Sequence, residues 1–493
     1  MEDKVLRERQ AKLSSKMAYG FADIYGGGAF VIISTFFTVF LTKALGMSPA
    51  LAGTIPLIGK VWDAITDPMM GNIADRTKSK FGAKRFYILI GSIISAITFV
   101  LLWIPFEGAF QYGFYVLMYI LFSTGFTVVM VPYNGLLPDM VEDYTVRSKF
   151  SSIRMIFSSF GAILAGLIPT IMIKDNTDSS QYFKVALIFG VIFIISILIT
   201  FFGTWEKDKP VKSMTMGETF TQSFTVYKSK AFVMFLCIFI FGQCAADFVT
   251  GLAVYYIDDV LNAYGGGNFT LLMGILLIAQ FLGMIIFAPV MAKTSKKFPI
   301  LVATPIRIIA TLALLFFSYE GANFKIILAL SFVIGLGMAA TSTSIYAILA
   351  DMADVDELIT GINRPGTVSG MATFIRKIST GLSTFLIGLL LSAINYDELL
   401  AAQKMRQCAS VQMGIVYIYV FSQVILLLIT LFVTWKFPMG KKEFEVIVKE
   451  VARRKGEDRS EITEDERRIC EKVTGFKYEN LWDKNNALKF KNN

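Results

Sequence analysis

The chain has 493 residues, of which 55% are hydrophobic and only 17% charged, and its mean hydropathy is +0.59. A soluble chain normally carries about a quarter charged residues, so this composition excludes an ordinary soluble globular protein. The formal net charge of +9 does not indicate a nucleic-acid partner, because the basic residues gather between apolar segments, where they fix membrane topology.

Twelve apolar segments follow one another along the chain, each long enough to cross about 30 Å of hydrocarbon as a helix. We therefore predict an all-α, multi-pass membrane protein with twelve transmembrane helices. The spans are expected near residues 17–44, 49–75, 86–106, 112–138, 150–173, 183–205, 231–257, 267–292, 299–318, 325–350, 367–393 and 411–436.

Lysine and arginine are concentrated in alternate connections between the spans. The N-terminal stretch, the second-to-third connection and the middle connection are basic, whereas the connection "EGAFQ" contains neither residue. The positive-inside rule then places both termini and the middle loop in the cytoplasm, in a cytoplasmic (inner) membrane. The expected parts are a cytoplasmic N-terminus, a first bundle, a middle loop, a second bundle and a cytoplasmic amphipathic tail, at 1–16, 17–205, 206–230, 231–436 and 437–493.

The two halves of the chain resemble each other. "LLPDMVED" ends the fourth span from Leu136, and "ILADMADV" ends the tenth span from Ile348. "NIADRTKSKF" follows the second span, and "VMAKTSKKF" follows the eighth at a similar separation along the chain. Repeats in the same order predict two six-helix bundles with a substrate path between them.

Two aspartates lie inside the second span, in the stretch "KVWDAITDPMMGNIADR". The spacing of four residues puts Asp63 and Asp67 on one helix face, one turn apart. One charge at a helix centre costs about 2.5–3.5 kcal/mol on insertion scales, and a second like charge beside it costs more. A bound cation, a shared proton or a nearby basic side chain would relieve this cost. We favour a cation-coupling site over a static buried ion pair.

Other chemistries have no support in the residue types present. The chain has no histidine, and its four cysteines show neither metal nor redox spacing. Its glycine-rich stretches precede no Lys-Ser/Thr pair, so they are not phosphate loops. We predict no enzyme activity, no resident cofactor or metal and no nucleotide-driven transport.

Several motifs resemble those of one transporter family. They are "WDAITDPMMG" followed by "ADRTKSKFGAKRFYILIG", "VPYNGLLPDM" with "RSKFSSIR", "LADMADVDE" with "TGINRPG", "TFIRK" and the tail stretch "CEKVTGFKYENLW". This set is similar to that of the glycoside–pentoside–hexuronide cation symporters of the major facilitator superfamily. The resemblance runs from Tyr19 into the tail. It implies the superfamily fold and the symport of a glycoside or related sugar with Na⁺, Li⁺ or H⁺.

The resemblance also implies roles for individual residues. Asp63 and Asp67 match the two acids that bind the coupling cation, and Thr66 and Thr127 match positions expected to add oxygen ligands. Lys377 lies inside the eleventh span, and its family counterpart lies close to the acid pair. We expect Lys377 to sense whether the acids are neutralised.

A substrate site is expected between the bundles. Arg154 matches a sugar-contacting arginine of the family, and its planar fork suits either adjacent hydroxyls or a carboxylate. The other candidates are Lys377, Thr373, Asp23, Asn134 and Tyr346. The chain departs from the family's sugar-binding pattern, because Gly27 and Met130 stand where that pattern has aspartate.

The stretch "GNIADRTKSKFG" resembles the loop motif that follows the second span in this superfamily. Its charges can lock the cytoplasmic side through hydrogen bonds that break on opening. The candidate gate residues are Asp75, Arg76, Arg85, Arg147 and Asp351, with Arg147 and Asp351 as a possible ion pair between the halves.

The sequence thus predicts a secondary active transporter that acts by alternating access, with a small-molecule sugar and a monovalent cation as ligands. It is expected to work as a monomer in the bilayer. Two alternatives stay open at this point. The first is a major facilitator transporter of a lysolipid or other amphiphile, and the second is a membrane sugar sensor that carries no flux.

Overall fold

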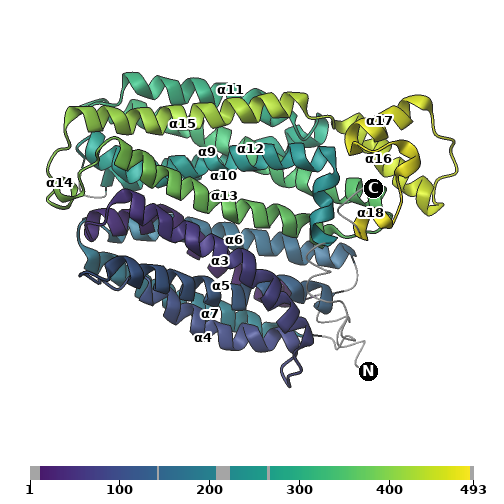
Figure 1. Cartoon of the computed structure of the whole chain (residues 1–493), viewed down its shortest axis with the longest axis horizontal. Coiled ribbons are helices and arrows are strands. Elements are labelled where there is room, and N and C mark those ends of the chain that lie inside the picture. The colour runs from purple at the N-terminus through teal and green to yellow at the C-terminus, as the bar shows by residue number, and fades with distance from the viewer. Residues whose placement is uncertain (1–11, 142–143, 207–221, 264–266, 489–493) are drawn as a thin grey trace. The chain divides into compact units, whose positions relative to one another are not determined.

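The computed structural model describes residues 12–141, 144–206, 222–263 and 267–488, and every regular element in these ranges is helical (Figure 1). The elements of the first half are α2 (Leu13–Ile32), η1 (Ile33–Phe37), η2 (Phe40–Ala44), α3 (Pro49–Arg76), α4 (Ala83–Leu101), α5 (Gln111–Met140), α6 (Tyr144–Met172) and α7 (Ser179–Gly203). Those of the second half are η3 (Phe224–Lys228), α9 (Lys230–Tyr255), η4 (Tyr256–Val260), α10 (Gly267–Lys293), α11 (Phe298–Ala313), η5 (Leu314–Phe316), α12 (Phe324–Thr360), α13 (Pro365–Ala393), α14 (Glu398–Ala402) and α15 (Ala409–Lys436). The tail adds α16 (Lys441–Lys455), α17 (Glu464–Thr474), η6 (Tyr478–Asn480) and α18 (Asn485–Leu488).

Eleven helical segments of the described chain are long and apolar enough to cross a membrane. The remaining expected span corresponds to α3, a 28-residue helix that carries Lys60, Asp63 and Asp67 in its middle. The prediction of an all-α membrane protein is therefore confirmed.

The helix at the tenth predicted span is longer than the span itself. The tenth span was expected to end near residue 350, but α12 continues to Thr360. It ends at Gly361, whose φ of 65° is the left-handed conformation of a helix C-cap and whose N–H donates to the Glu357 carbonyl over 2.7 Å. The acidic stretch after Ala350 thus extends the helix.

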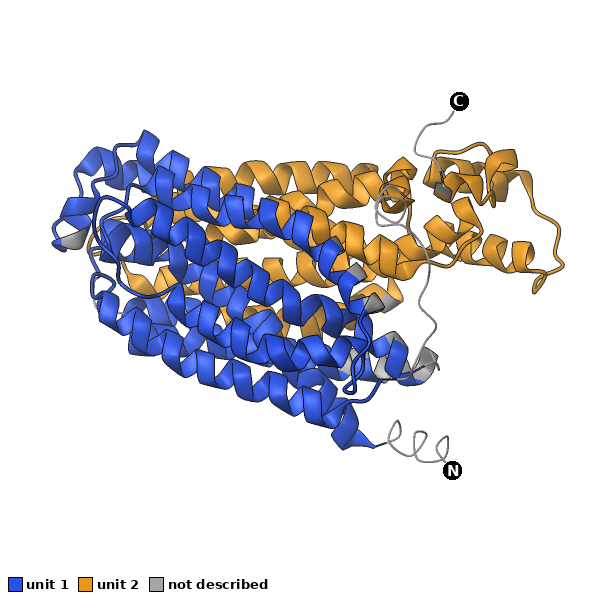
Figure 2. Cartoon of the chain, turned by 60° about the horizontal axis from the view of Figure 1, so that its bottom comes forward, with its two compact units in different colours: residues 1–213, 250–274, 381–415 blue, residues 214–249, 275–380, 416–493 orange. Residues whose placement is uncertain are grey.

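The chain forms two compact units, which differ from the two halves of the sequence (Figure 2). Unit 1 comprises Met1–Ser213, Thr250–Gly274 and Gly381–Ile415. Unit 2 comprises Met214–Val249, Ile275–Thr380 and Val416–Asn493. The second-half helices α9, α10, α13 and α15 therefore each contribute residues to both units.

Inside unit 1, α2 packs against α6 and α7, while α5 packs against α3 and α4. Glycines permit the close contact of α2 with α6. A Cβ on Gly27 would lie 2.6 Å from the Ser158 carbonyl oxygen, and one on Gly161 would lie 2.6 Å from the Ile24 carbonyl oxygen. The glycine-rich stretch of the first span thus serves helix packing.

Equivalent ion pairs mark the internal repeat. Lys84 at the start of α4 pairs with Asp139 near the end of α5 in unit 1, and Lys296 pairs with Asp351 of α12 in unit 2. The separation of the two lysines along the chain equals that of the two aspartates, and it is also the separation of the repeated acidic motif. The sequence repeat therefore corresponds to a repeated structural contact.

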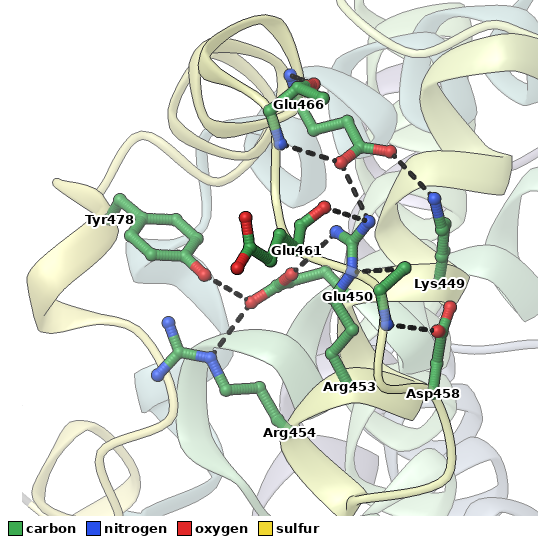
Figure 3. Close-up of polar contacts among 10 residues, drawn as sticks. Lys449, Glu450, Arg453, Arg454, Asp458, Glu461, Glu466 and Tyr478 are labelled. Carbon is green, nitrogen blue, oxygen red and sulfur yellow. Dashed lines mark hydrogen bonds and ion pairs between the residues drawn. The ribbon is translucent and has the colours of Figure 1, made fainter.

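The tail forms helices that pack on the end of α12 within unit 2. Figure 3 shows its polar centre, where Glu450 accepts hydrogen bonds from Arg453, Arg454 and Tyr478 over 3.1, 2.9 and 2.6 Å. The contact with α12 includes the Trp482 N–H, which donates to the Leu358 carbonyl over 2.9 Å. Another tail contact is the ion pair of Lys455 with buried Glu357, at 2.8 Å.

The tail should lose stability in acid. The N–H of Thr463, followed by Arg453 and Lys449, holds the pKa of Glu466 at about 2. Because a carboxyl with a depressed pKa stabilises the fold only while ionised, its contribution is complete above about pH 4.5 and is lost as the pH falls towards 2. Peptic cleavage within residues 441–474, normalised to the isolated tail peptide, should accelerate several-fold over this window. Glu466→Gln should remove most of that pH dependence, and an unchanged profile in the variant would contradict this role.

Candidate functional site

The predicted acids lie on α3 where this helix packs against α5, inside unit 1. Gly59 makes the close contact possible, because a Cβ there would lie 2.2 Å from the Tyr119 ring and 3.3 Å from the Ser123 hydroxyl. Gly59, Asp63 and Asp67 follow one another at intervals of four positions, so they form one line along this face.

Asp63 is buried, with 1% of its surface exposed. Its Oδ2 lies 3.1 Å from the ammonium of Lys60, one turn earlier on the same helix. Its Oδ1 is also buried and has no hydrogen-bond partner among the described residues. One oxygen of this carboxylate is thus compensated while the other is not, which costs free energy in a buried setting.

Asp67 lies one turn further along α3 and is half-buried. Thr127 of α5 donates its hydroxyl to Asp67 Oδ1 over 2.7 Å. The hydroxyl of Thr66 instead donates to the carbonyl of Trp62 in its own helix, over 3.0 Å. The structure therefore brings Thr127 onto an acid and leaves Thr66 bonded to the backbone.

Ser123 was not predicted as a site residue. Its hydroxyl is buried, and within the described part of the chain it has no hydrogen-bond partner. Ser123 lies one helical turn before Thr127 on α5. Ser123 faces Gly59 of α3, whereas Thr127 bonds Asp67, so Asp63 lies between these two hydroxyls along the helix axis. Two unsatisfied oxygens, Asp63 Oδ1 and Ser123 Oγ, therefore belong to the same α3–α5 face as the Asp67–Thr127 pair.

This set of atoms suits a small hard cation. Carboxylate and hydroxyl oxygens are the ligands that hard cations prefer, and two of the oxygens here lack a partner among the described residues. A proton requires only the carboxylates. The residues present therefore fit the predicted cation site, with Ser123 as an added candidate ligand.

A second charged pair connects α2 with α6 in unit 1. Arg154 binds Asp23 through two hydrogen bonds, Nε to Oδ2 over 3.0 Å and Nη2 to Oδ1 over 3.3 Å. Its guanidinium lies over the ring of Tyr133, 4.9 Å from the centroid, and Asp23 is 4% exposed. The carboxylate-binding edge of this arginine is thus occupied by the protein's own acid.

Unit 2 contains a similar pair on α9 and α13. Arg376 binds Asp247 through both Nη atoms, over 2.6 and 2.7 Å. Asp247 lies nearly as far after Asp23 along the chain as Arg376 lies after Arg154. Both separations are close to that of the internal sequence repeat. The pairing of Arg376 with Asp247 was not predicted, because the two residues are 129 positions apart.

The remaining substrate candidates lie on three helices. Asn134 on α5 is exposed and belongs to unit 1. Tyr346 on α12 is 52% exposed, and Thr373 on α13 donates its hydroxyl to the Ser369 carbonyl over 2.9 Å. Lys377 is half-buried on α13 and belongs to unit 2, whereas the acids belong to unit 1, so its coupling role stays a prediction.

The structure describes the side chains of two of the five residues predicted to form the cytoplasmic gate, Arg85 and Asp351. Arg85 donates to the Phe81 and Phe201 carbonyls over 3.2 and 2.8 Å, and its backbone N–H donates to Glu206. Asp351 accepts from Lys296 of its own unit. The side chains of Asp75, Arg76 and Arg147 lie outside the described residues.

A buried charge cluster at the far end of the first span was missed altogether. Lys43, 1% exposed, lies 3.1 Å from Asp258 Oδ2 and 2.9 Å from Asp259 Oδ2. Asn176 donates to Asp258 over 2.7 Å, and Tyr396 donates to Asp259 over 3.0 Å. We call these five residues the Lys43 cluster.

The Lys43 cluster joins segments of both sequence halves within unit 1. A cavity of about 170 Å³ lies beside it, lined by Lys43, Lys174, Asp175, Asn176, Thr177, Asp258, Ala401 and Lys404. Breaking this cluster would leave buried charges without partners, so it stabilises the contact between these segments.

Known proteins that this chain resembles in sequence are named as transporters or symporters. A family model described as MFS/sugar transport protein matches residues 18–441. The uncharacterized symporter YjmB of Bacillus subtilis is 26% identical over 404 residues, covering 79% of this chain and 85% of that protein. The isoprimeverose transporter of Lactiplantibacillus pentosus is 25% identical over 404 residues, covering 80% and 82%.

Solved structures show the same fold. A bacterial homologue of the human lysosomal transporter Spinster, in an inward-facing and unoccupied conformation, aligns with a TM-score of 0.62 at 14% identity, covering 91% of this chain and 98% of that one. The D-xylose-proton symporter aligns with a TM-score of 0.57 at 14% identity, covering 86% and 97%. At this identity the likeness establishes the fold alone.

Proposed function

Because the chain belongs to the MFS/sugar transport protein family, we propose that it is a cation-coupled symporter of a neutral glycoside or related sugar. The observation that carries the coupling is the α3–α5 face, where Asp63 Oδ1 and Ser123 Oγ are buried without partners in the described structure, beside the Asp67–Thr127 hydrogen bond. These oxygens would hold Na⁺ or Li⁺, and the carboxylates alone would hold a proton.

Relatives support a sugar as cargo. Among them are an isoprimeverose transporter and proteins named a putative glycoside/cation symporter and a putative sulfoquinovose importer. The first-half and tail motifs further support the glycoside–pentoside–hexuronide branch. For this chain we propose two six-helix bundles in the cytoplasmic membrane. Both termini would lie in the cytoplasm, and the monomer would be the functional unit.

The Arg154–Asp23 pair favours a neutral sugar within this class. The guanidinium edge that could clamp a substrate carboxylate already binds Asp23. The pair has little net charge, and together its oxygens and N–H groups can accept from and donate to adjacent hydroxyls. The Tyr133 ring fixes the guanidinium plane from one side. We therefore propose that Arg154 and Asp23 bind the sugar, and we keep Asn134, Tyr346, Thr373 and Lys377 as further candidates from the sequence.

The proposed cycle uses these parts in order. The cation binds Asp63 and Asp67 first and neutralises these acids. Lys377 responds to this neutralisation, and sugar binding between the bundles improves. The bundles then rock, with the Lys43 cluster closing one end of the path and the loop charges around Lys84 and Asp139 closing the other. Coupling is reciprocal, so the sugar tightens cation binding by the same factor.

Substrate competition tests the proposed cargo. Counterflow of a labelled neutral glycoside in proteoliposomes should be inhibited by unlabelled neutral glycosides and much less by glucuronides, because Asp23 already occupies the guanidinium edge that would bind an added carboxylate. Preferential inhibition by glucuronides would contradict the neutral-sugar assignment. Inhibition by lysolipids alone would favour an amphiphile transporter, and saturable glycoside binding without counterflow would favour a sensor.

A further inference from the structure

Lys60 is in direct contact with an acid of the candidate cation site, although it was not predicted as a site residue. Its ammonium is 3.1 Å from Asp63 Oδ2, on the carboxylate to which we assign the coupling cation. The residue is 8% exposed, so bulk water does not screen this pair strongly. An ammonium and a sodium ion carry the same charge, and each would neutralise the same acid.

The surroundings of Lys60 hold its ammonium against Asp63. The stem packs on Gly381 of α13, where a Cβ would lie 2.9 Å from Lys60 Cγ. The ammonium also lies over the ring of Phe30 on α2, 5.4 Å from the centroid, an arrangement in which the ring attracts the cation. Phe30 and Gly381, both in unit 1, therefore favour the docked position of the side chain.

Docking leaves the site incompletely satisfied. Lys60 contacts one oxygen of Asp63, while Oδ1 of the same carboxylate and Ser123 Oγ stay without partners in the described structure. A small cation lying between α3 and α5 can contact several oxygens at once, whereas the tethered ammonium is held on one side. The lysine is thus a replaceable partner for this acid.

We propose that Lys60 is a tethered cation that competes with the coupling cation for Asp63. This inference rests on the proposed function, since it assumes that a free cation binds here. In the absence of that cation, Lys60 neutralises Asp63. When the cation binds, it displaces the ammonium, so the apparent affinity equals the intrinsic affinity multiplied by the fraction of molecules in which Lys60 is undocked.

The test is the sign of the change in Na⁺ affinity, measured by isothermal titration calorimetry on the purified full chain. Lys60→Gln removes the competitor and should bind Na⁺ about tenfold more tightly than the wild type, a change of about 1.4 kcal/mol. Lys60→Arg keeps the charge and should stay near the wild-type value. Lys325→Gln removes an equal charge from an exposed position and serves as the matched control.

A supporting role for Lys60 predicts the opposite sign, because loss of a structural partner weakens the site. Unchanged or weaker Na⁺ binding by Lys60→Gln would overturn the proposal. If that variant does not fold, Phe30→Leu provides a second test without a change of charge, and it should tighten Na⁺ binding by about threefold as the docked ammonium loses its aromatic contact.

The two proposals fail in distinguishable ways. A wild type that binds Na⁺, with no gain in Lys60→Gln, would reject the competition while leaving symport intact. Na⁺ binding that appears only in Lys60→Gln would support the competition but contradict sodium coupling of the natural chain. No Na⁺ binding in either protein would reject the competition for this ion.

Discussion

Asp63→Asn should abolish the accumulation of sugar against its gradient. The substitution removes a carboxylate of the candidate cation site and leaves the Lys60 ammonium, 8% exposed, without its only described acidic partner. Removing one member of a buried pair costs about 3–5 kcal/mol, so loss of both coupling and thermal stability is expected. In proteoliposomes with an imposed cation gradient, the ratio of internal to external sugar should fall to about one.

Asp178→Asn is a matched control for Asp63→Asn. Asp178 caps α7 by accepting from the Ser180 N–H over 2.9 Å, and asparagine is an equally good N-cap. This variant should accumulate sugar like the wild type. The double variant Lys60→Gln with Asp63→Asn should recover stability without recovering accumulation, since the unpaired charge is gone but the ligand is still missing. Full accumulation by Asp63→Asn would make the acid purely structural.

Lys43→Met should open the end of unit 1 that the Lys43 cluster closes. The methionine removes the ammonium that pairs with both Asp258 and Asp259, and both acids are 1% exposed. By the same argument of an uncompensated buried charge, the closed arrangement should lose about 3–5 kcal/mol. Hydrogen exchange of the backbone in residues 174–178 and 256–263 should become faster, and the midpoint of thermal unfolding should fall.

Removal of the acids tests whether charge is the cause. Adding Asp258→Asn and Asp259→Asn to Lys43→Met should restore slow exchange, because no charge of the Lys43 cluster is then unpaired. Lys325→Met, at an exposed site, should leave exchange in both segments unchanged. Slow exchange in Lys43→Met itself would show that packing, for example the Thr42–Tyr255 hydrogen bond of 2.7 Å, closes this end.

The sequence predicted the helical architecture because long apolar segments have few other stable forms. Lipid leaves no partner for unpaired backbone groups, so such segments must be helical in a membrane. It also predicted the position of the two acids on one helix face, since a spacing of four positions determines that geometry. The repeated acidic motif anticipated that Asp139 and Asp351 hold equivalent places.

The partners of the buried charges were harder to predict. Lys60 stands three positions before Asp63 in the same motif, so a one-turn ion pair could have been proposed from spacing alone. Lys43 and Asp258 are 215 positions apart, and each lies at a span end where charges are usually solvated. No local pattern indicates that tertiary packing buries them together.

Uptake of a labelled neutral glycoside into proteoliposomes, under an imposed Na⁺ or H⁺ gradient, tests the central claim most directly. Symport predicts that the wild type accumulates the sugar above its external concentration with one of the two gradients, and that Asp63→Asn only equilibrates it. Equal uptake by both proteins, without accumulation under either gradient, would contradict cation-coupled symport.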